Sequence, residues 1–157
     1  MIFKLINLFL LMTIGIAYLY TFILAVKARF KSAEPHSIAF VIVFTAALVS
    51  ASVNLFAVAE ITSDAVSFFL NQQSYLKAIL YALAFFGGMW VFSLVLFHSS
   101  FLIISSFTEE DEKEALENNN IELAMLHAVV LITLAFVISP ALLSIAVEFI
   151  PYPKRPF

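Results

Sequence analysis

The chain contains no cysteine, only three glycines and few charged residues. The absence of cysteine excludes disulfide bonds, thiolate metal sites and cysteine nucleophiles. Charged residues make up 12% of the chain, whereas soluble domains contain about 25%. Hydrophobic residues make up 63% of the 157 residues, and a soluble fold of this size could not bury that much apolar surface. The composition therefore predicts a protein that resides in a membrane.

Asp, Glu, Lys and Arg are absent from four long stretches, which cover residues 5–26, 36–59, 78–107 and 123–147. Each stretch is at least as long as the roughly 20 residues that cross the hydrocarbon core of a bilayer. Apolar runs of this length favour helices over barrel strands, because a helix satisfies its backbone hydrogen bonds internally. We therefore predict an all-α, polytopic membrane protein with four transmembrane helices, at about 6–26, 37–60, 75–106 and 121–149.

The segments outside these helices are short, so we expect a single membrane domain over residues 1–157 and no soluble catalytic domain. The first apolar stretch is longer than the core of a signal peptide, and we expect it to remain in the mature protein. The connector 107–120 is strongly acidic, and Thr108 followed by Asp111 is typical of a capping box that starts a short helix. The tail 150–157 contains three prolines and cannot continue a helix.

The two halves of the chain match each other at a shift of 88 residues. Seven identities fall within the 27 positions from Glu34 to Glu60, and the two glutamates that bracket this window align with Glu122 and Glu148. Apolar helices match by chance at several positions, so the bracketing carboxylates are the informative part. The pattern indicates two parallel two-helix repeats related by an axis along the membrane normal.

Four polar residues are candidates for the lining of a pore. Ser50 and Asn54 lie on a stripe of small and polar residues along the second helix, while Glu60 and Glu148 lie at equivalent ends of the second and fourth helices. Intramembrane ionisable residues often line ion paths. The simpler interpretation, which we favour, is that the stripe packs against other helices and that both glutamates lie at the headgroups.

Two histidines are expected at similar depth on neighbouring helices, since His98 precedes the acidic connector by about as many residues as His127 follows it. Two imidazoles can ligate a haem or relay protons. No residue spacing typical of a metal site accompanies them, because Glu122 and His127 are five residues apart and face different directions on a helix. We therefore favour histidines that form hydrogen bonds between helices, and we predict no metal and no cofactor.

The middle of the third helix combines small residues with the single tryptophan, at Ala84, Gly87, Gly88 and Trp90. Ala84 and Gly88 form a small-xxx-small pair, which allows another helix to approach closely. The indole N–H of Trp90 needs a hydrogen-bond partner away from the membrane interface, where tryptophan usually lies. Packing within the subunit and contact with another subunit explain this pattern equally well.

The fourth helix opens with Asn120, Ile121, Glu122, Leu123 and Ala124 after the acidic connector. With the two-helix repeat, this opening resembles the YjfL-type bacterial inner-membrane family, a tandem two-helix domain of unknown function. The resemblance covers most of the chain. It implies a multi-pass protein of the bacterial inner membrane, but it implies no activity and no site residues.

No phosphate loop, nucleophile elbow or zinc signature is present in the sequence, so we predict a protein that is not an enzyme. Our first hypothesis is a membrane subunit that assembles with itself or with a partner membrane protein. The alternatives are an oligomeric channel or small-solute transporter, which a liposome flux assay would detect, and a haem-binding redox subunit, which Soret absorption would reveal. The net charge of −3 gives no support for nucleic-acid binding.

Overall fold

The computed structural model describes residues 2–29, 37–108 and 118–149, and within these ranges the chain forms helices joined by turns, with no strand. Its four helices are α1 (Ile2–Arg29), α2 (Ile38–Asn71), α3 (Tyr75–Ser105) and α5 (Ile121–Glu148). All four are long and apolar enough to cross a membrane. The prediction of an all-α protein with four transmembrane helices is therefore confirmed. The short helix expected in the acidic connector and the tail 150–157 lie outside the described residues.

The second helix is longer than the sequence predicts, because α2 continues to Asn71 instead of ending near residue 60. The added turns carry apolar residues at helical spacing, and Ile61, Ala65 and Phe69 are buried there. Glu60 and Asp64 lie on the exposed side of the same turns. A charged side chain on the outward side of a helix does not end the helix. The charge-free stretch is therefore shorter than α2 itself. The starts of α3 and α5 coincide with the prediction, and the remaining boundaries differ from it by one to four residues.

Side-chain caps fix the starts of two parallel helices. The Ser37 hydroxyl oxygen accepts from the backbone N–H of Phe40 at 3.2 Å, and the Asn120 amide oxygen accepts from Leu123 at 3.1 Å. Serine and asparagine are favoured at this position because they satisfy free backbone N–H groups. Asn119, with φ of 57°, joins the two starts, since its side-chain oxygen accepts from the backbone N–H of Ala39 at 3.0 Å.

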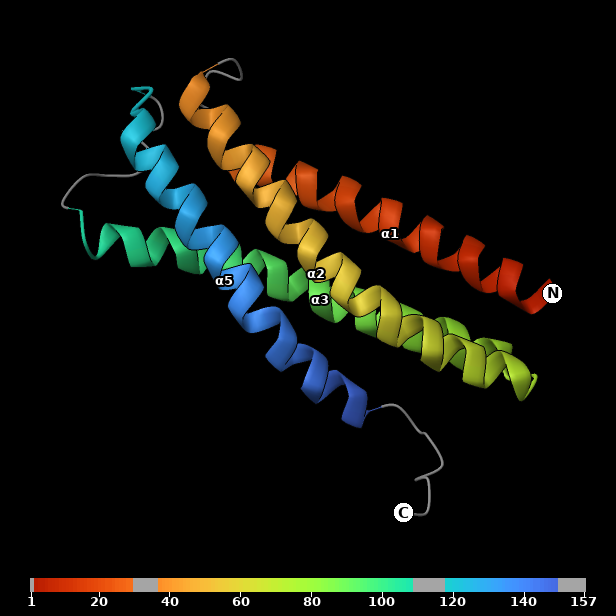
Figure 1. Ribbon diagram of the computed structural model, residues 1–157. Helices are drawn as coiled ribbons and strands as arrows, with labels where there is room; N and C mark the ends of the chain where they lie inside the picture. Colours follow the sequence, from red (N-terminus) through yellow and green to blue (C-terminus); the bar gives the residue numbers. More distant parts are fainter. Residues whose placement is uncertain (1, 30–36, 109–117, 150–157) are drawn as a thin grey trace.

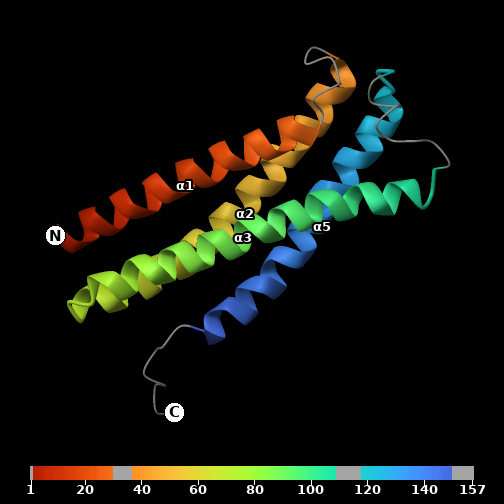
Figure 2. The ribbon, with the colours of Figure 1, turned by 180° about the vertical axis from the view of Figure 1, so that it is seen from behind.

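The pair formed by α2 and α3 is the centre of the molecule, and α1 and α5 lie on its two sides (Figure 1). Both central helices contact α1 and α5, whereas α1 and α5 do not lie against each other in the described ranges. Seen from behind, α3 lies in front of the C-terminal part of α2 (Figure 2). The outward faces of α2 and α3 are therefore on opposite sides of the molecule.

Alanines fill the contacts between helices, and Ala51, Ala82, Ala124 and Ala135 are completely buried. Small residues allow the close helix packing that is typical of membrane proteins. Large apolar side chains point outward instead, as Phe9 and Leu76 do, which suits a surface covered by lipid. α2 and α5 run in the same direction (Figure 1), as two parallel repeats would require. Any pair of consecutive helical hairpins has this property, so the repeat remains a prediction.

α5 contains Pro140 in its interior and still continues to Glu148. Proline has no N–H to donate within the helix, but transmembrane helices tolerate it where neighbouring groups compensate. Towards its C-terminal end α5 diverges from α3, as both views show (Figures 1 and 2).

Candidate functional site

A buried polar cluster joins all four helices near their middles. It consists of Tyr18 on α1, Asn54 on α2, Ser93 on α3 and Ser139 on α5, each less than 5% exposed. The Asn54 amide nitrogen donates to the Ser93 hydroxyl oxygen at 2.8 Å, and the Ser139 hydroxyl donates to the Asn54 amide oxygen at 2.5 Å. The hydroxyls of Tyr18 and Ser93 are 2.6 Å apart. We name these four residues the polar cluster.

The hydrogen bonds of the polar cluster can run in one direction. Because the Ser93 oxygen accepts from Asn54, its own proton can be donated to the Tyr18 oxygen. Tyr18 can then donate to the backbone carbonyl of Ala51 at 3.4 Å. In this arrangement each hydroxyl proton has an acceptor, which is how buried polar groups avoid the cost of desolvation.

The polar cluster fits a structural role better than a chemical one. All four members lie inside the charge-free stretches of their helices. The cluster contains no carboxylate, imidazole or amine, so it offers no acid, base or metal ligand at neutral pH. In membranes such hydrogen bonds contribute about 0.6 kcal/mol each, and at most about 1.7 kcal/mol. Together they hold the four helices in one register.

The structure separates the four residues proposed as a pore lining. Ser50 and Asn54 are buried against other helices, with exposed fractions of 2% and 0%. Glu60 and Glu148 are exposed on the outside of α2 and α5. Of the four members of the polar cluster, only Asn54 was identified from the sequence, as a residue of the small and polar stripe. Tyr18, Ser93 and Ser139 were missed. Their only sequence signal is a polar side chain within a charge-free stretch.

The two histidines lie in different environments. His127 is 2% exposed, and its Nε2 lies 3.0 Å from the hydroxyl of Ser100 on α3. His98 is exposed, and its Nδ1 lies 2.8 Å from the carbonyl of Leu94 on its own helix. In the described part of the chain, no group of three His, Cys, Asp or Glu residues could hold a metal ion.

His127 belongs to a series of ring contacts that ends at a cation. The ring of Phe101 lies against the imidazole with 3.8 Å between ring centroids and 50° between ring planes, and the Arg29 guanidinium carbon lies 4.6 Å from the centroid of Phe101. Arg29 is the last residue of α1, so these contacts join α1, α3 and α5 at one end of the molecule. The guanidinium is attracted to the negative face of the aromatic ring.

Replacing Arg29 by methionine should lower the free energy of unfolding by about 0.5–1 kcal/mol, the usual strength of a cation–π contact at an exposed site. Methionine keeps the apolar reach of the side chain and removes the charge. Unfolding in mild detergent, followed by circular dichroism, measures the difference. Lys27→Met is the matched control, because Lys27 is also exposed in the last turn of α1. Equal losses in both variants would contradict the role of the contact with Phe101.

A third group of polar contacts lies at the opposite end of α1. The Asn7 amide nitrogen donates to the hydroxyls of Ser63 and Ser67 on α2, at 3.1 and 3.0 Å. Asn7 is 7% exposed, and its amide oxygen has no partner in the described residues. These contacts fix α1 beside the extended part of α2.

The small residues of α3 face outward and do not pack within the subunit. Ala84, Gly87 and Gly88 are exposed, and a Cβ atom built on either glycine would meet no atom within 4 Å. Gly88 and Ala84 line an open groove of about 220 Å³ between α3 and the diverging part of α5. The indole nitrogen of Trp90 is buried and has no hydrogen-bond partner in the described part of the chain.

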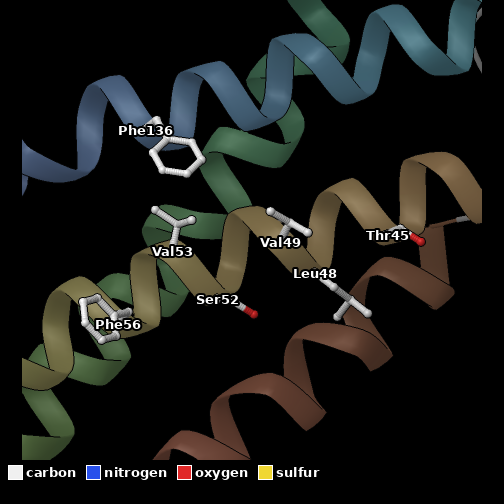
Figure 3. A pocket seen from close by; sticks show the side chains of 7 residues that line it. All are labelled: Thr45, Leu48, Val49, Ser52, Val53, Phe56 and Phe136. Carbon is white, nitrogen blue, oxygen red and sulfur yellow. The ribbon is translucent and has the colours of Figure 1, made fainter.

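A second groove runs along the outward face of α2 (Figure 3). Its volume is about 480 Å³, and most of its lining is apolar. The lining residues are Thr45, Leu48, Val49, Ser52, Val53 and Phe56 of α2, together with Phe136 of α5. This groove lies on the face of α2 that points away from α3.

The four spanning helices and their buried polar contacts define an integral membrane protein with four transmembrane helices. A family profile described as Domain of Unknown Function (DUF350) matches residues 2–142. The chain belongs to this family, in agreement with the expected membrane domain family of unknown function. Neither a curated protein nor a solved structure matches it.

Proposed function

We propose that this protein is a non-enzymatic membrane subunit that works by assembling with copies of itself. The observation that carries the proposal is the outward position of Ala84, Gly87 and Gly88 on α3. Packing within the subunit does not use these small residues. In a bilayer, small residues on a helix surface let a second helix approach the backbone closely. The same face would suit a partner membrane protein, which is the alternative.

One further feature near this face supports assembly. The open groove beside Gly88 leaves room for an inserted side chain, which a neighbouring helix could supply.

We also propose the cellular context that the YjfL-type resemblance implies, the bacterial inner membrane. The opening of α5 at Asn120 supports this narrower assignment, as does the two-helix pattern. The channel and haem alternatives remain predictions. A purified protein without Soret absorption would remove the haem alternative.

Replacing Gly88 by leucine should convert the assembled protein to monomers while leaving the fold of the subunit unchanged. A Cβ atom at Gly88 meets no atom within 4 Å in the described part of the subunit, and the groove beside it has room for the rest of the side chain. Leucine at this position would, however, separate two helix backbones in close contact. Native mass spectrometry in mild detergent measures the stoichiometry, and thermal unfolding tests the fold. Ala17→Leu is the control, because Ala17 is an exposed small residue on α1.

Two results are expected from native mass spectrometry. The wild-type protein should form assemblies of more than one copy after gentle purification. Gly88→Leu should reduce the number of copies, whereas Ala17→Leu should not. A protein that is monomeric in detergent and in lipid nanodiscs, with no retained partner, would overturn it.

A further inference from the structure

The outward face of α2 carries charge at a depth where its neighbours are apolar. We name the exposed residues along this face the α2 strip: Thr45, Val49, Ser52, Phe56, Glu60 and Asp64. They recur every three or four residues, so they form one line along the helix. The groove shown in Figure 3 follows the first four of them, and the two carboxylates continue the line beyond it.

Contacts between helices fix the depth of Glu60. α2 and α3 are antiparallel, and Asn54 bonds to Ser93, so Glu60 lies level with Gly87, six residues before Ser93. The ring contact of Phe69 with Tyr81, at 4.7 Å, gives the same register to within about one turn.

At this level the surfaces of the neighbouring helices are apolar. Phe9 on α1 is 76% exposed, and Leu83 on α3 is 52% exposed. The first charge of α3, Lys77, lies ten residues beyond Gly87, which is about 15 Å along the helix. The exposed Ile79, Leu80 and Leu83 lie in that interval. Lipid or a packed apolar helix, but not water, therefore has to cover α1 and α3 at the depth where α2 exposes Glu60.

A carboxylate that faces hydrocarbon is costly, and ionisable residues within membranes almost always face a bundle interior or a water-filled cavity. Glu60 does not face the interior of this bundle, because it lies on the outward side of α2. No side chain in the described ranges forms an ion pair or hydrogen bond with it. The water that hydrates the carboxylate of Glu60 must therefore lie between this subunit and another molecule.

We infer that the α2 strip faces a water-containing space enclosed by several copies of this chain. The inference rests on the proposed self-assembly and adds which face points inward. Lipid cannot hydrate Glu60, whereas a second copy presents the same hydroxyls and carboxylates across the space. α2 also buries more of its length within the subunit than α3 does, with 16 of 34 residues buried against 10 of 31, so α2 exposes the narrower surface. The groove at Ala84 and Gly88 lies between α3 and α5, so neighbouring copies can pack there while the α2 strip of each copy faces the shared space.

The absence of cysteine allows a direct test with single cysteines. Phe56→Cys places a thiol on the α2 strip, at an 81% exposed position one turn from Glu60. Ile16→Cys is the matched control, because Ile16 is two residues before Tyr18 on α1, about level with Phe56, and is 65% exposed. The reaction with a charged, membrane-impermeant thiol reagent is measured in liposomes.

Only the thiolate reacts, and it does not form in hydrocarbon, so Phe56→Cys should react at least about tenfold faster than Ile16→Cys. Oxidation should also link Phe56→Cys, but not Ile16→Cys, into covalent dimers. Equal rates at both positions in a protein that native mass spectrometry finds assembled would overturn this inference and leave the proposed function standing. A protein found only as a monomer would overturn both. Cross-linking of Phe56→Cys to a different protein would also overturn the inference, because it would show that the strip docks another partner.

Discussion

Replacing Asn54 by leucine is expected to lower the free energy of unfolding by about 2–3 kcal/mol. The substitution keeps the volume of the side chain but removes its bonds to Ser93 and Ser139. Each lost bond is worth up to about 1.7 kcal/mol in a membrane protein. A buried hydroxyl left without a partner adds about 1–3 kcal/mol. Asn54 is completely buried, so water cannot replace its amide.

Unfolding in mixed detergent micelles, monitored by circular dichroism, measures this loss. Thr45→Leu is the control on the same helix, because Thr45 is exposed and belongs to no polar cluster. Combining Asn54→Leu with Ser139→Ala gives a further test. The double variant should be less destabilised than the sum of the single variants, because both substitutions remove the same bond. Strict additivity would show that the bond between these side chains contributes nothing.

Replacing Ala135 by leucine is expected to cost about 1–3 kcal/mol, since extra methylene groups in a filled contact force the neighbouring helices apart. Ala135 is completely buried and lies one turn from both Leu131 and Ser139 on the inward face of α5. Because Ser139 bonds to Asn54, a displacement of α5 would also stretch the polar cluster.

Ala141→Leu provides the matched control, since Ala141 lies on the same helix but is exposed. Thermal unfolding in detergent should separate the two variants, with a lower midpoint for Ala135→Leu only. If both alanines tolerate leucine equally, the contact between α2 and α5 is looser than the structure indicates.

The four helices could be predicted because their signal is local. Charge is excluded from hydrocarbon, so charge-free stretches of sufficient length locate the spans without knowledge of the packing. The same rule placed the end of α2 too early. Glu60 and Asp64 interrupt the charge-free stretch, but they do so on the outward side of a helix whose inward side continues to Leu70.

The polar cluster could be predicted only in part, because its composition depends on how the helices align. The stripe that contains Asn54 is visible along one helix. The partners Tyr18, Ser93 and Ser139 come from three other helices, and nothing in their own neighbourhoods distinguishes them from other buried hydroxyls. Similar depth in the membrane was also insufficient to predict whether the two histidines lie close together. The rotation of each helix about its axis places His127 inside the bundle and His98 outside.

The separation of α1 from α5 has an energetic consequence. The two helices do not lie against each other in the described ranges, so most disturbances of one should leave the other unaffected. The shortest bonded route between them runs from Tyr18 through Ser93 and Asn54 to Ser139. In the middle of the molecule, a mechanical signal that starts in the first helix and ends in the last passes through these two side chains, whereas at the Arg29 end Phe101 alone lies between the two helices.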